Sequence, residues 1–324
     1  MKVYPFVDVV KFVLCFLVIA IHCNSYSLIP EKLCELAVPL FFVFSGFFIF
    51  PKVVSQGVYD SSVWRYVLKL LRLYLTYTIV FFPLAIYGFI HSDTPFIQAL
   101  YRYIRNFLLI GSQYYSWHLW YVLATIVAVS LIALLSRKWK LEAVFVFAVV
   151  LSALGLLLDM LKAAPSGNSM VDGLVSMYFR LFFTVRNGFF WGLLYVSTGM
   201  LIRKYEAFLI CRYRIVSALL LVAVVFYIRD IMTTKSLVVC LSGSLCFLPA
   251  LNRLVNPDVS KTLRQVSVLV FFFHLYFCFL FVEVLSLDST VAFFAVSVSS
   301  VAFAALLLYL IRWPRFHWLR FFLA

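Results

Sequence analysis

Long apolar runs alternate with short polar segments along the whole sequence. A helix that crosses a bilayer needs about 20 mostly apolar residues, and about ten of the runs approach that length. We therefore expect an all-α, polytopic integral membrane protein with about ten transmembrane helices, arranged as one transmembrane domain over residues 1–324. Two of the runs are short, so nine or eleven spans remain open. The expected spans are roughly 6–26, 35–50, 70–90, 117–136, 141–162, 187–203, 214–233, 236–251, 265–286 and 290–311.

The composition supports the same class of protein. Apolar residues make up 65% of the 324 residues, charged residues make up only 12%, and the mean hydropathy is +1.05. A water-soluble domain does not bury so much apolar surface. The 36 Phe and 19 Tyr residues are therefore expected to serve mainly as lipid-facing and interfacial side chains.

The formal net charge of +14 could indicate an acidic partner such as a nucleic acid. The basic residues, however, lie in short clusters between apolar runs, and the sequence contains no soluble basic domain that could bind a double-stranded nucleic acid. We therefore expect no nucleic acid among the partners, and the positions of the charges indicate topology instead.

Lys and Arg fall mostly on one side of the expected membrane. With the N-terminus inside, 18 of the 27 basic residues lie in inner segments and 8 in outer ones, while Lys11 lies within the first span. The 13 acidic residues divide into 5 inside and 8 outside. Because cytoplasmic connections are enriched in Lys and Arg, we expect both termini in the cytoplasm.

The seven Cys residues show no C-x-x-C motif and no spacing typical of Cys and His metal ligands. We expect neither a metal site nor a disulfide framework. Cys23 and Cys34 flank one short loop and could pair in an oxidising compartment, although two buried thiols are the favoured interpretation. No small-residue cleavage site follows the first apolar run, so we expect that run to be retained as a helix.

The longest outer connections, residues 91–116 and 163–186, carry apolar side chains at helical spacing, among them Phe96, Tyr101 and Phe107. This pattern predicts helices that lie on the membrane surface. They could act as a lid over an outward-facing substrate or as an interfacial anchor, and the anchor is slightly favoured.

Ionisable residues inside membrane spans usually face the protein interior and have a function. Lys11 and His22 are eleven positions apart, which is three helical turns plus roughly 20° and about 16 Å along the axis. The two side chains therefore share one face at different depths. Asp8 can form a purely structural ion pair with Lys11. A lone His near a helix end is ordinarily interfacial, yet an imidazole is also well suited to accept a proton from a hydroxyl.

His118 and His274 also lie within apolar runs. Each alone is more often a hydrogen-bonded packing residue than a catalyst. Glu283 is nine positions from His274, about 180° around a helix, so it is not expected to orient that ring.

Arg65, Lys69 and Arg72 form a basic stripe at the cytoplasmic start of the third span. A polyphosphate such as coenzyme A could dock there, and an orientation signal with snorkelling side chains explains the stripe equally well. Nucleotide hydrolysis and soluble-hydrolase chemistry are disfavoured, because the sequence has no Walker A loop, no G-x-S-x-G elbow and no H-E-x-x-H motif.

Five blocks, in order, resemble the acyltransferase-3 family of membrane O-acyltransferases, most of all the branch that includes enterobacterial common antigen O-acetyltransferase. Together they span most of the chain. The blocks are Asp8-Val9-Val10-Lys11 through His22; Val38-Pro39-Leu40-Phe41-Phe42-Val43-Phe44-Ser45-Gly46-Phe47-Phe48; Trp117-His118-Leu119-Trp120-Tyr121; Arg186-Asn187-Gly188-Phe189-Phe190-Trp191-Gly192-Leu193 with Gly199; and Phe273-His274-Leu275-Tyr276.

The resemblance implies a multi-pass protein of the bacterial cytoplasmic (inner) membrane with no bound cofactor. It implies acetyl-CoA or another acyl-CoA as the cytoplasmic donor, and a hydroxyl of a cell-surface carbohydrate or related molecule as the acceptor. The family's catalytic His falls on His22. Its basic residue falls on Lys11, where Arg is more usual, and an ammonium lacks the bidentate fork of a guanidinium.

The sequence thus leads to the hypothesis of a membrane O-acyltransferase in which His22 is the general base for an acceptor hydroxyl. The hydroxyl either attacks the acyl-CoA thioester directly or receives the acyl group after a relay across the membrane, which could be covalent. One rival is a secondary transporter or flippase for a lipid-linked sugar or small anionic solute, which often shows two related halves that are not visible here. Another is a non-catalytic scaffold, against which polar residues in three separate spans argue. The expected substrate-binding residues are Lys11, Ser45, Arg65, Arg72, Trp117, His118, Arg186, Asn187 and His274.

Overall fold

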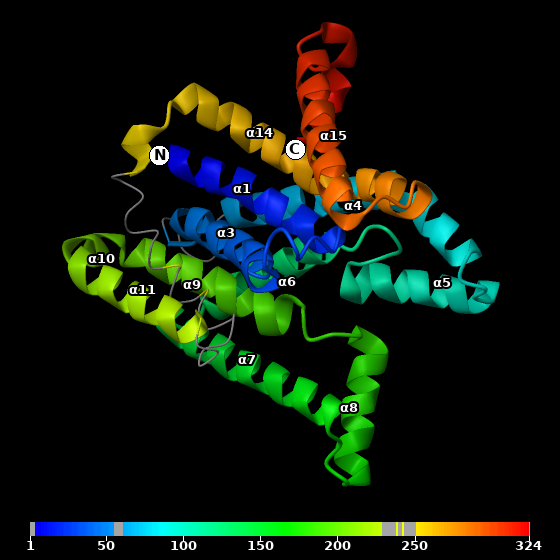
Figure 1. Cartoon of the computed structure of the whole chain (residues 1–324). Helices are drawn as coiled ribbons and strands as arrows, with labels where there is room; N and C mark the ends of the chain where they lie inside the picture. The colour runs from blue at the N-terminus through cyan, green and yellow to red at the C-terminus, as the bar shows by residue number, and fades with distance from the viewer. Residues whose placement is uncertain (1–3, 55–60, 229–237, 239–241, 243–250, 324) are drawn as a thin grey trace. The chain divides into compact units, whose positions relative to one another are not determined.

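The computed structural model describes residues 4–54, 61–228, 238, 242 and 251–323, and this part of the chain consists of helices and connecting loops without a strand (Figure 1). The chain divides into two compact units. Residues 1–41 and 205–324 form the first unit, and residues 42–204 form the second.

The first unit brings the two ends of the chain together. Its elements are α1 (Pro5–His22), α2 (Glu31–Cys34), α10 (Glu206–Cys211), α11 (Tyr213–Ile228), η4 (Asn252–Leu254), α14 (Pro257–Cys278), η5 (Phe279–Val284), α15 (Ser289–Leu310) and η6 (Pro314–Phe322).

The second unit is formed by the central part of the chain. The helix α3 (Ala37–Val54) begins in the first unit and continues into the second. The other elements are α4 (Ser61–Ile90), α5 (Phe96–Arg105), η1 (Asn106–Ile110), α6 (Leu119–Leu135), α7 (Leu141–Ala163), α8 (Ser169–Phe182), η2 (Gly188–Gly192) and α9 (Leu193–Lys204).

Within the described residues, 6 helical segments are long and apolar enough to cross a membrane, which makes the chain a multi-pass membrane protein. They are Pro5–His22, Glu31–Pro51, Ser62–Ile90, Leu141–Ala163, Pro257–Val284 and Ser289–Leu310, and the shorter apolar helices are Leu119–Leu135 and Tyr213–Tyr227.

Most expected spans therefore coincide with a helix. The expected span at 187–203 corresponds to η2 and α9 taken together. The one expected at 236–251 falls almost wholly outside the described residues, so the count of ten stays a prediction.

The helix boundaries differ from the expected ones where polar residues fix an end. α14 begins at Pro257 because the side chain of Asn256 accepts the Asp258 backbone N–H at 2.8 Å, and proline suits the first helical turn. α1 ends at His22. There Asn24 takes a left-handed backbone with φ of 52°, and the Ser25 hydroxyl donates to the Ser289 carbonyl at 2.6 Å.

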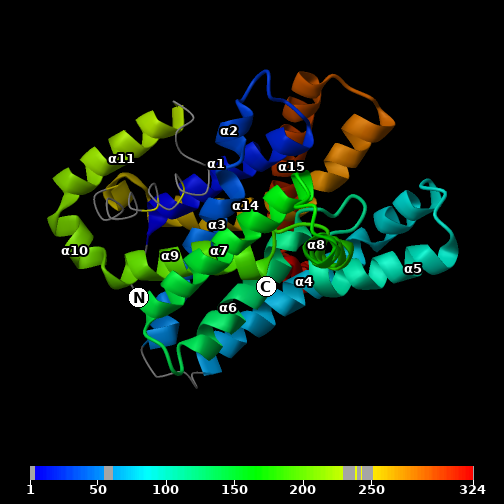
Figure 2. The same ribbon diagram turned by 90° about the horizontal axis from the view of Figure 1, so that it is seen from below.

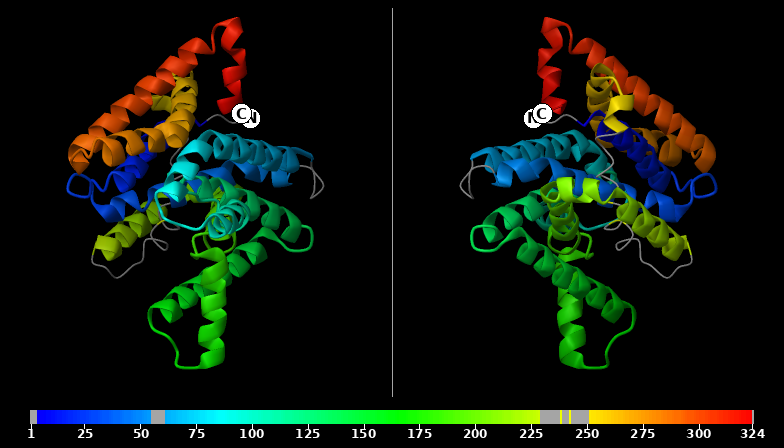
Figure 3. Two further views of the ribbon diagram at one scale, coloured as in Figure 1. Left: turned by 90° about the vertical axis from the view of Figure 1, so that its right-hand side faces the viewer. Right: turned by 90° about the vertical axis from the view of Figure 1, so that its left-hand side faces the viewer.

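α1 and α14 lie side by side and run in the same direction (Figure 1). Ser260 contacts Asp8 near the start of both helices, and Cys278 contacts Cys23 near their ends. Two parallel spans cross the membrane in the same direction, so an odd number of other spans must lie between them in the sequence. The ten expected spans meet this condition, because α1 corresponds to the first of them and α14 to the ninth. α14 then continues through η5 and the chain turns back into α15 (Figure 3).

In the second unit, α4 packs alongside α6 (Figure 2), and α7 packs on α9 and η2. The buried residues of α7 form a single stripe of small or β-branched side chains, and the remainder of that helix is left for lipid. The stripe consists of Val144, Ala148, Ser152 and Gly155.

Glycine sets a close approach between α3 and α9. A Cβ at Gly46 would overlap the backbone carbonyl of Val196, and one at Gly199 would overlap the carbonyl of Val43. Gly46 and Gly199 therefore permit the close approach of these two helices within this unit.

The two long connections at residues 91–116 and 163–186 contain helices that leave apolar side chains exposed. α5 buries no residue, and Phe96 and Ile97 are more than two thirds exposed, at 78% and 75%. On α8, Met170, Leu174 and Met177 share one exposed face. Such faces suit the membrane interface, as the sequence predicted, and both the lid and the anchor remain compatible with them.

We expect Gly46→Ala to lower the stability of the folded protein by about 1–3 kcal/mol, because the added methyl group must displace backbone rather than a flexible side chain. The measurement is the thermal unfolding midpoint in detergent. Gly173→Ala is the control, since a Cβ at Gly173 meets no atom within 4 Å. Equal midpoints for the two variants would contradict the close approach.

We also expect mild oxidation to join Cys23 to Cys278, whose sulfur atoms lie 4.0 Å apart in a buried position. A modest change of side-chain torsion brings two such sulfurs to the roughly 2.05 Å of a disulfide. Mass spectrometry of peptides from a variant retaining only these two cysteines would detect the link. An antiparallel or shifted pairing of α1 and α14 would leave both thiols free.

Candidate functional site

Polar residues line the contact between α1 and α14 at every seventh position. The Ser260 hydroxyl donates to the Asp8 carboxylate at 2.6 Å, and the Cys15 thiol donates to the Ser267 carbonyl at 3.4 Å. Both pairs are separated by 252 residues in sequence, and His22 and His274 are separated by the same number. A contact that repeats every seven residues is the geometry of two parallel helices packed in a fixed register. We call these three pairs the α1–α14 seam.

The end of this seam at the last turn of α1 brings two imidazoles together. The ring centroids of His22 and His274 lie 5.3 Å apart with an interplanar angle of 37°. His274 is buried, with 1% of its surface exposed, whereas His22 is half-buried at the last position of α1. The residue predicted to be catalytic and the residue predicted to bind substrate are therefore neighbours.

Backbone carbonyls determine which nitrogen of His274 carries the proton. Its Nδ1 lies 2.8 Å from the carbonyl oxygen of Phe271 and 3.2 Å from that of Val270. Because a carbonyl oxygen only accepts, Nδ1 must be the protonated nitrogen of the neutral ring. The lone pair of His274 is then on Nε2.

The other end of the seam is rich in positive charge. Lys11 lies next to Asp8 in the helix, and the charges of Asp8 and Arg264 both act on it. The Asp8 carboxylate is buried and already accepts from Ser260. Lys11 and Arg264 therefore bring two positive charges to this end of the seam, beside the Asp8 carboxylate.

Two further contacts hold the start of α1. The Tyr4 hydroxyl lies 3.1 and 3.2 Å from the two oxygens of the Glu206 carboxylate, with both side chains buried. The backbone N–H of Phe6 donates to the Asn252 side chain at 3.1 Å. These contacts fix the first turn of α1, from which Lys11 projects less than two turns later.

The remaining expected site residues lie in the second unit. Ser45 and Tyr121 share a hydrogen bond of 2.9 Å, which ties α3 to α6. Trp117 is 40% exposed, whereas His118 is buried and packs edge-on against Phe81 with ring centroids 5.1 Å apart.

The basic residues of α4 are presented on the surface of that helix. Arg65, Lys69 and Arg72 are all exposed, and they lie on the helix itself because α4 begins earlier than expected, at Ser61. The structure therefore places the stripe where either a polyphosphate or the lipid headgroups can reach it.

Arg186 and Asn187 organise the start of η2. The Arg186 guanidinium lies over the Trp191 ring at 5.4 Å. The Asn187 side-chain oxygen accepts the backbone N–H groups of Phe189 at 3.0 Å and Phe190 at 3.1 Å. Asn187 is thus a helix cap, a role that the sequence did not reveal.

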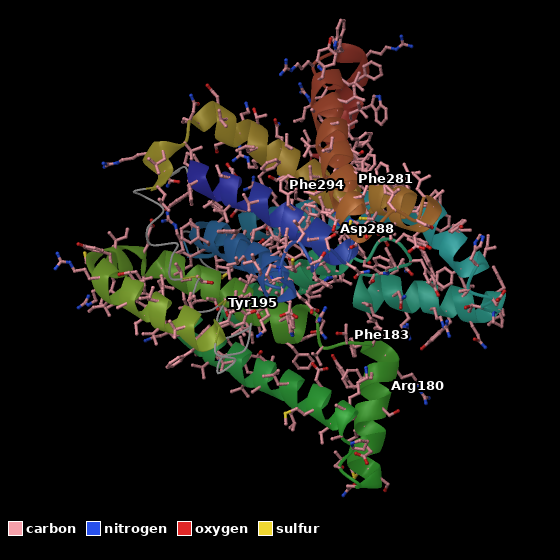
Figure 4. The ribbon with its side chains drawn as sticks, in the orientation of Figure 1. Arg180, Phe183, Tyr195, Phe281, Asp288 and Phe294 are labelled. Carbon is pink, nitrogen blue, oxygen red and sulfur yellow. The ribbon has the colours of Figure 1, made fainter. Side chains whose placement is uncertain are left out.

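The Asn187 amide also donates to the Tyr178 hydroxyl at 2.9 Å, and that hydroxyl donates to the Thr184 carbonyl at 3.1 Å. Burial raises the pKa of Tyr178 to about 12, so its hydroxyl keeps the proton that it donates. These bonds join α8 to η2 across a turn in which Phe183, labelled with Arg180 in Figure 4, has a φ of 62°. In addition, Arg105 of α5 donates to the Arg180 carbonyl at 3.0 Å.

The structure brings out polar partners that the sequence did not single out. Arg264 lies near Lys11, Ser260 pairs with Asp8, and Tyr121 pairs with Ser45. The sequence did contain one signal, since Arg264 precedes His274 by ten positions much as Lys11 precedes His22 by eleven. Within the described part of the chain, no group of three His, Cys, Asp or Glu side chains could hold a metal ion.

Comparison with known families adds to this geometry. Residues 4–309 match a family described as an acyltransferase domain, the acyltransferase-3 domain. The chain belongs to this acyltransferase-3 family. Its polar seam is therefore part of a membrane acyltransferase domain, and the match takes in residues of both units. No solved structure matches the chain.

Curated relatives are more distant. The chain is 29% identical over 212 residues to a serine/alanine racemase of Enterococcus gallinarum, covering 61% of this chain and 29% of that protein. It is 24% identical over 205 residues to an amino-acid racemase of Enterococcus faecalis, covering 60% of this chain and 27% of that protein. The chain thus spans under a third of the length of these relatives, and racemisation is an activity named for them.

We expect Asn187→Ala to destabilise the η2 cap by about 1 kcal/mol. The loss should appear as a lower unfolding midpoint in detergent and faster proteolysis at residues 183–187. Asn187→Asp serves as the control, because a carboxylate still accepts the two backbone N–H groups. If Asp and Ala lower the midpoint equally, capping is not the main contribution of Asn187.

Proposed function

We propose that this protein transfers an acyl group, most simply acetyl, from cytoplasmic acyl-CoA to a hydroxyl of a cell-surface carbohydrate or related acceptor. The observation that carries the proposal is the α1–α14 seam, which has a cationic end at Lys11 and an imidazole pair at His22. Membership of the acyltransferase-3 family supports the reaction type.

His22 is the general base in this proposal. It accepts the proton of the acceptor hydroxyl while the oxygen attacks the thioester carbonyl carbon. The C–S bond then breaks, and the departing thiolate of coenzyme A takes the proton back from His22. The products are an O-acyl ester and free coenzyme A, and the imidazole returns to its neutral form.

Lys11 and Arg264 bind the phosphates of the donor in this proposal. Lys11 is about 16 Å from His22 along the helix axis. The arm that joins the phosphates of coenzyme A to its sulfur spans about 15–18 Å when extended, by ordinary covalent geometry. A donor bound at the cationic end can therefore present its thioester near His22 without a covalent relay. The exposed Arg65 and Arg72 of α4, in the second unit, are also proposed to bind substrate.

The carbohydrate acceptor is supported by the resemblance of the sequence blocks to the enterobacterial common antigen branch. Trp117, His118 and Arg186 are the residues we propose to line its binding region. The bacterial inner membrane, with both termini in the cytoplasm, is supported by the uneven distribution of Lys and Arg.

The decisive experiment incubates purified protein in proteoliposomes with labelled acetyl-CoA and bacterial glycans. Release of coenzyme A coupled to labelling of a glycan supports the acyltransferase. Movement of an unmodified solute across the membrane without thioester cleavage would support the transporter instead and overturn the proposal.

We expect His22→Ala to lower kcat by at least about 100-fold, because a general base contributes about 10²–10⁴ to the rate. His317→Ala is the matched control, since His317 is exposed on η6 far along the chain. The readout is coenzyme A release per mole of folded, membrane-inserted protein. Activity of His22→Ala close to that of the wild type would remove His22 from the mechanism.

We expect Lys11→Ala to raise the KM for acetyl-CoA by about 10-fold while changing kcat less, because one charge-assisted phosphate contact is worth about 1.5–3 kcal/mol. Lys11→Arg should restore the KM, since the guanidinium also binds phosphate. An unchanged KM in Lys11→Ala would place the donor elsewhere.

A further inference from the structure

The segment that follows α15 differs sharply in charge from α15 itself. Residues 311–323 contain three arginines and no acidic residue, whereas α15 carries no charged residue. The apolar span Ser289–Leu310 has 22 residues, which at 1.5 Å per residue is about 33 Å, close to the thickness of the hydrocarbon core of a bilayer. The arginines, which are Arg312, Arg315 and Arg320, therefore begin where this span leaves the hydrocarbon.

η6 has a buried side and exposed sides that follow a three-residue spacing. A 3-10 helix has three residues per turn, so residues i and i+3 lie on the same side. Leu319 is only 6% exposed, and Phe316 and Phe322 on the same side are partly buried. Arg315 and Trp318 share the next side and are both exposed. The segment therefore presents one side to the rest of its unit and leaves its cations on the surface.

Aromatic rings hold the segment against α14 and α15. The ring centroid of Phe322 lies 5.7 Å from that of Phe273, and the ring centroid of Phe303 lies 4.9 Å from the same ring. Phe303 is seven residues before the end of α15, about 10 Å along the helix axis. η6 thus folds back along the span by roughly this depth (Figure 3). This is the depth of the boundary between lipid headgroups and acyl chains.

The exposed side chains of the segment combine cations with indole rings. Trp313 and Trp318 are 55% and 65% exposed, next to arginines that are exposed as well. Indole rings collect at the level of the headgroups, because they have an apolar body and a polar N–H. Guanidinium groups bind phosphate through two parallel hydrogen bonds. A topology signal requires only the charge, whereas this surface also has the aromatic groups that a headgroup site uses.

We propose that this segment binds anionic phospholipids. The guanidinium groups of Arg312, Arg315 and Arg320 contact the lipid phosphates. The indole rings of Trp313 and Trp318 lie beside them in the headgroup region. We call these five residues the C-terminal basic surface.

Charge and apolar area together select this occupant. Three positive side chains in a segment without an acidic residue favour a headgroup with net negative charge over a zwitterionic one. The exposed indoles favour a lipid phosphate over a free phosphate, because a soluble anion would leave the rings in water. This surface is a lipid site in addition to the proposed acyl transfer and does not depend on it.

The first test uses the full-length wild-type protein in vesicles. The vesicles contain a probe with a photoactivatable group at the headgroup, either on phosphatidylglycerol or on phosphatidylcholine, and mass spectrometry of peptides locates the label. We expect residues 312–320 to carry at least about fivefold more label from phosphatidylglycerol, since each basic side chain near an anionic surface strengthens binding roughly fivefold. Residues 285–294, at the other end of the span and without Lys or Arg, should show no such preference. Equal labelling of residues 312–320 by the two lipids would overturn the inference.

The second test measures the affinity of the purified full-length protein for phosphatidylglycerol by native mass spectrometry in detergent. We expect the triple variant Arg312→Gln, Arg315→Gln, Arg320→Gln to bind at least about 10-fold more weakly, because all three phosphate contacts are lost. His317→Ala is the matched control, since His317 is an exposed side chain of the same segment without a permanent charge, and its affinity should stay unchanged. A triple variant that binds as tightly as the wild type would contradict the inference.

A third measurement separates a lipid phosphate from a free phosphate. Trp318→Ala should weaken the binding of phosphatidylglycerol about threefold or more, while inorganic pyrophosphate should not displace the lipid from the wild-type protein. If pyrophosphate displaces the lipid and Trp318→Ala binds it as the wild type does, the surface is a site for a soluble anion and the lipid assignment is wrong. Acyl transfer is measured in none of these tests, so their failure is distinct from a failure of the proposed function.

Discussion

The fixed register between α1 and α14 is the interaction on which the proposed chemistry depends. In a membrane, polar groups must be satisfied by other protein groups because lipid offers none. The seam meets this requirement by pairing carboxylate with hydroxyl and thiol with carbonyl, and one repeat further on the two imidazole rings lie side by side. Because each pair is costly to separate in lipid, the pairs oppose sliding of one helix along the other. The position of His22 relative to His274 follows from that resistance.

The second unit relies on a different means of fixing its helices. α3 and α9 approach so closely that backbone carbonyls occupy the space a side chain would need at Gly46 and Gly199. Such contacts gain from dispersion over a large area, which is the main source of helix association in lipid. Polar contacts are added at the ends, where Asn187 and Tyr178 join η2 to α8. The two units thus show both ways in which a membrane protein can specify helix positions.

The sequence predicted the features that depend on local composition and periodicity. Apolar length located most of the membrane helices, and helical geometry placed Lys11 and His22 on one face. It could not predict features that depend on partners distant in the chain. The approach of His274 to His22 and of Ser260 to Asp8 requires the register of two helices 252 residues apart, which no local pattern contains. The cap formed by Asn187 was missed for a simpler reason, because an asparagine beside an arginine suggests ligand binding as readily as it suggests capping.

The spacing of seam residues within each helix has a consequence for how the chain tolerates change. Asp8 and His22 are as far apart on α1 as Ser260 and His274 are on α14, so the paired residues stay level with one another along the two helices. Residues inserted in the long stretch between the two helices would leave the spacing of the seam residues within each helix unchanged. One residue deleted between Ser267 and His274 would instead rotate the position of His274 by about 100° around α14. It would also shorten the distance from Ser260 to His274 along the helix axis by about 1.5 Å. The alignment of the two imidazoles therefore depends on the same residue spacing occurring in both α1 and α14.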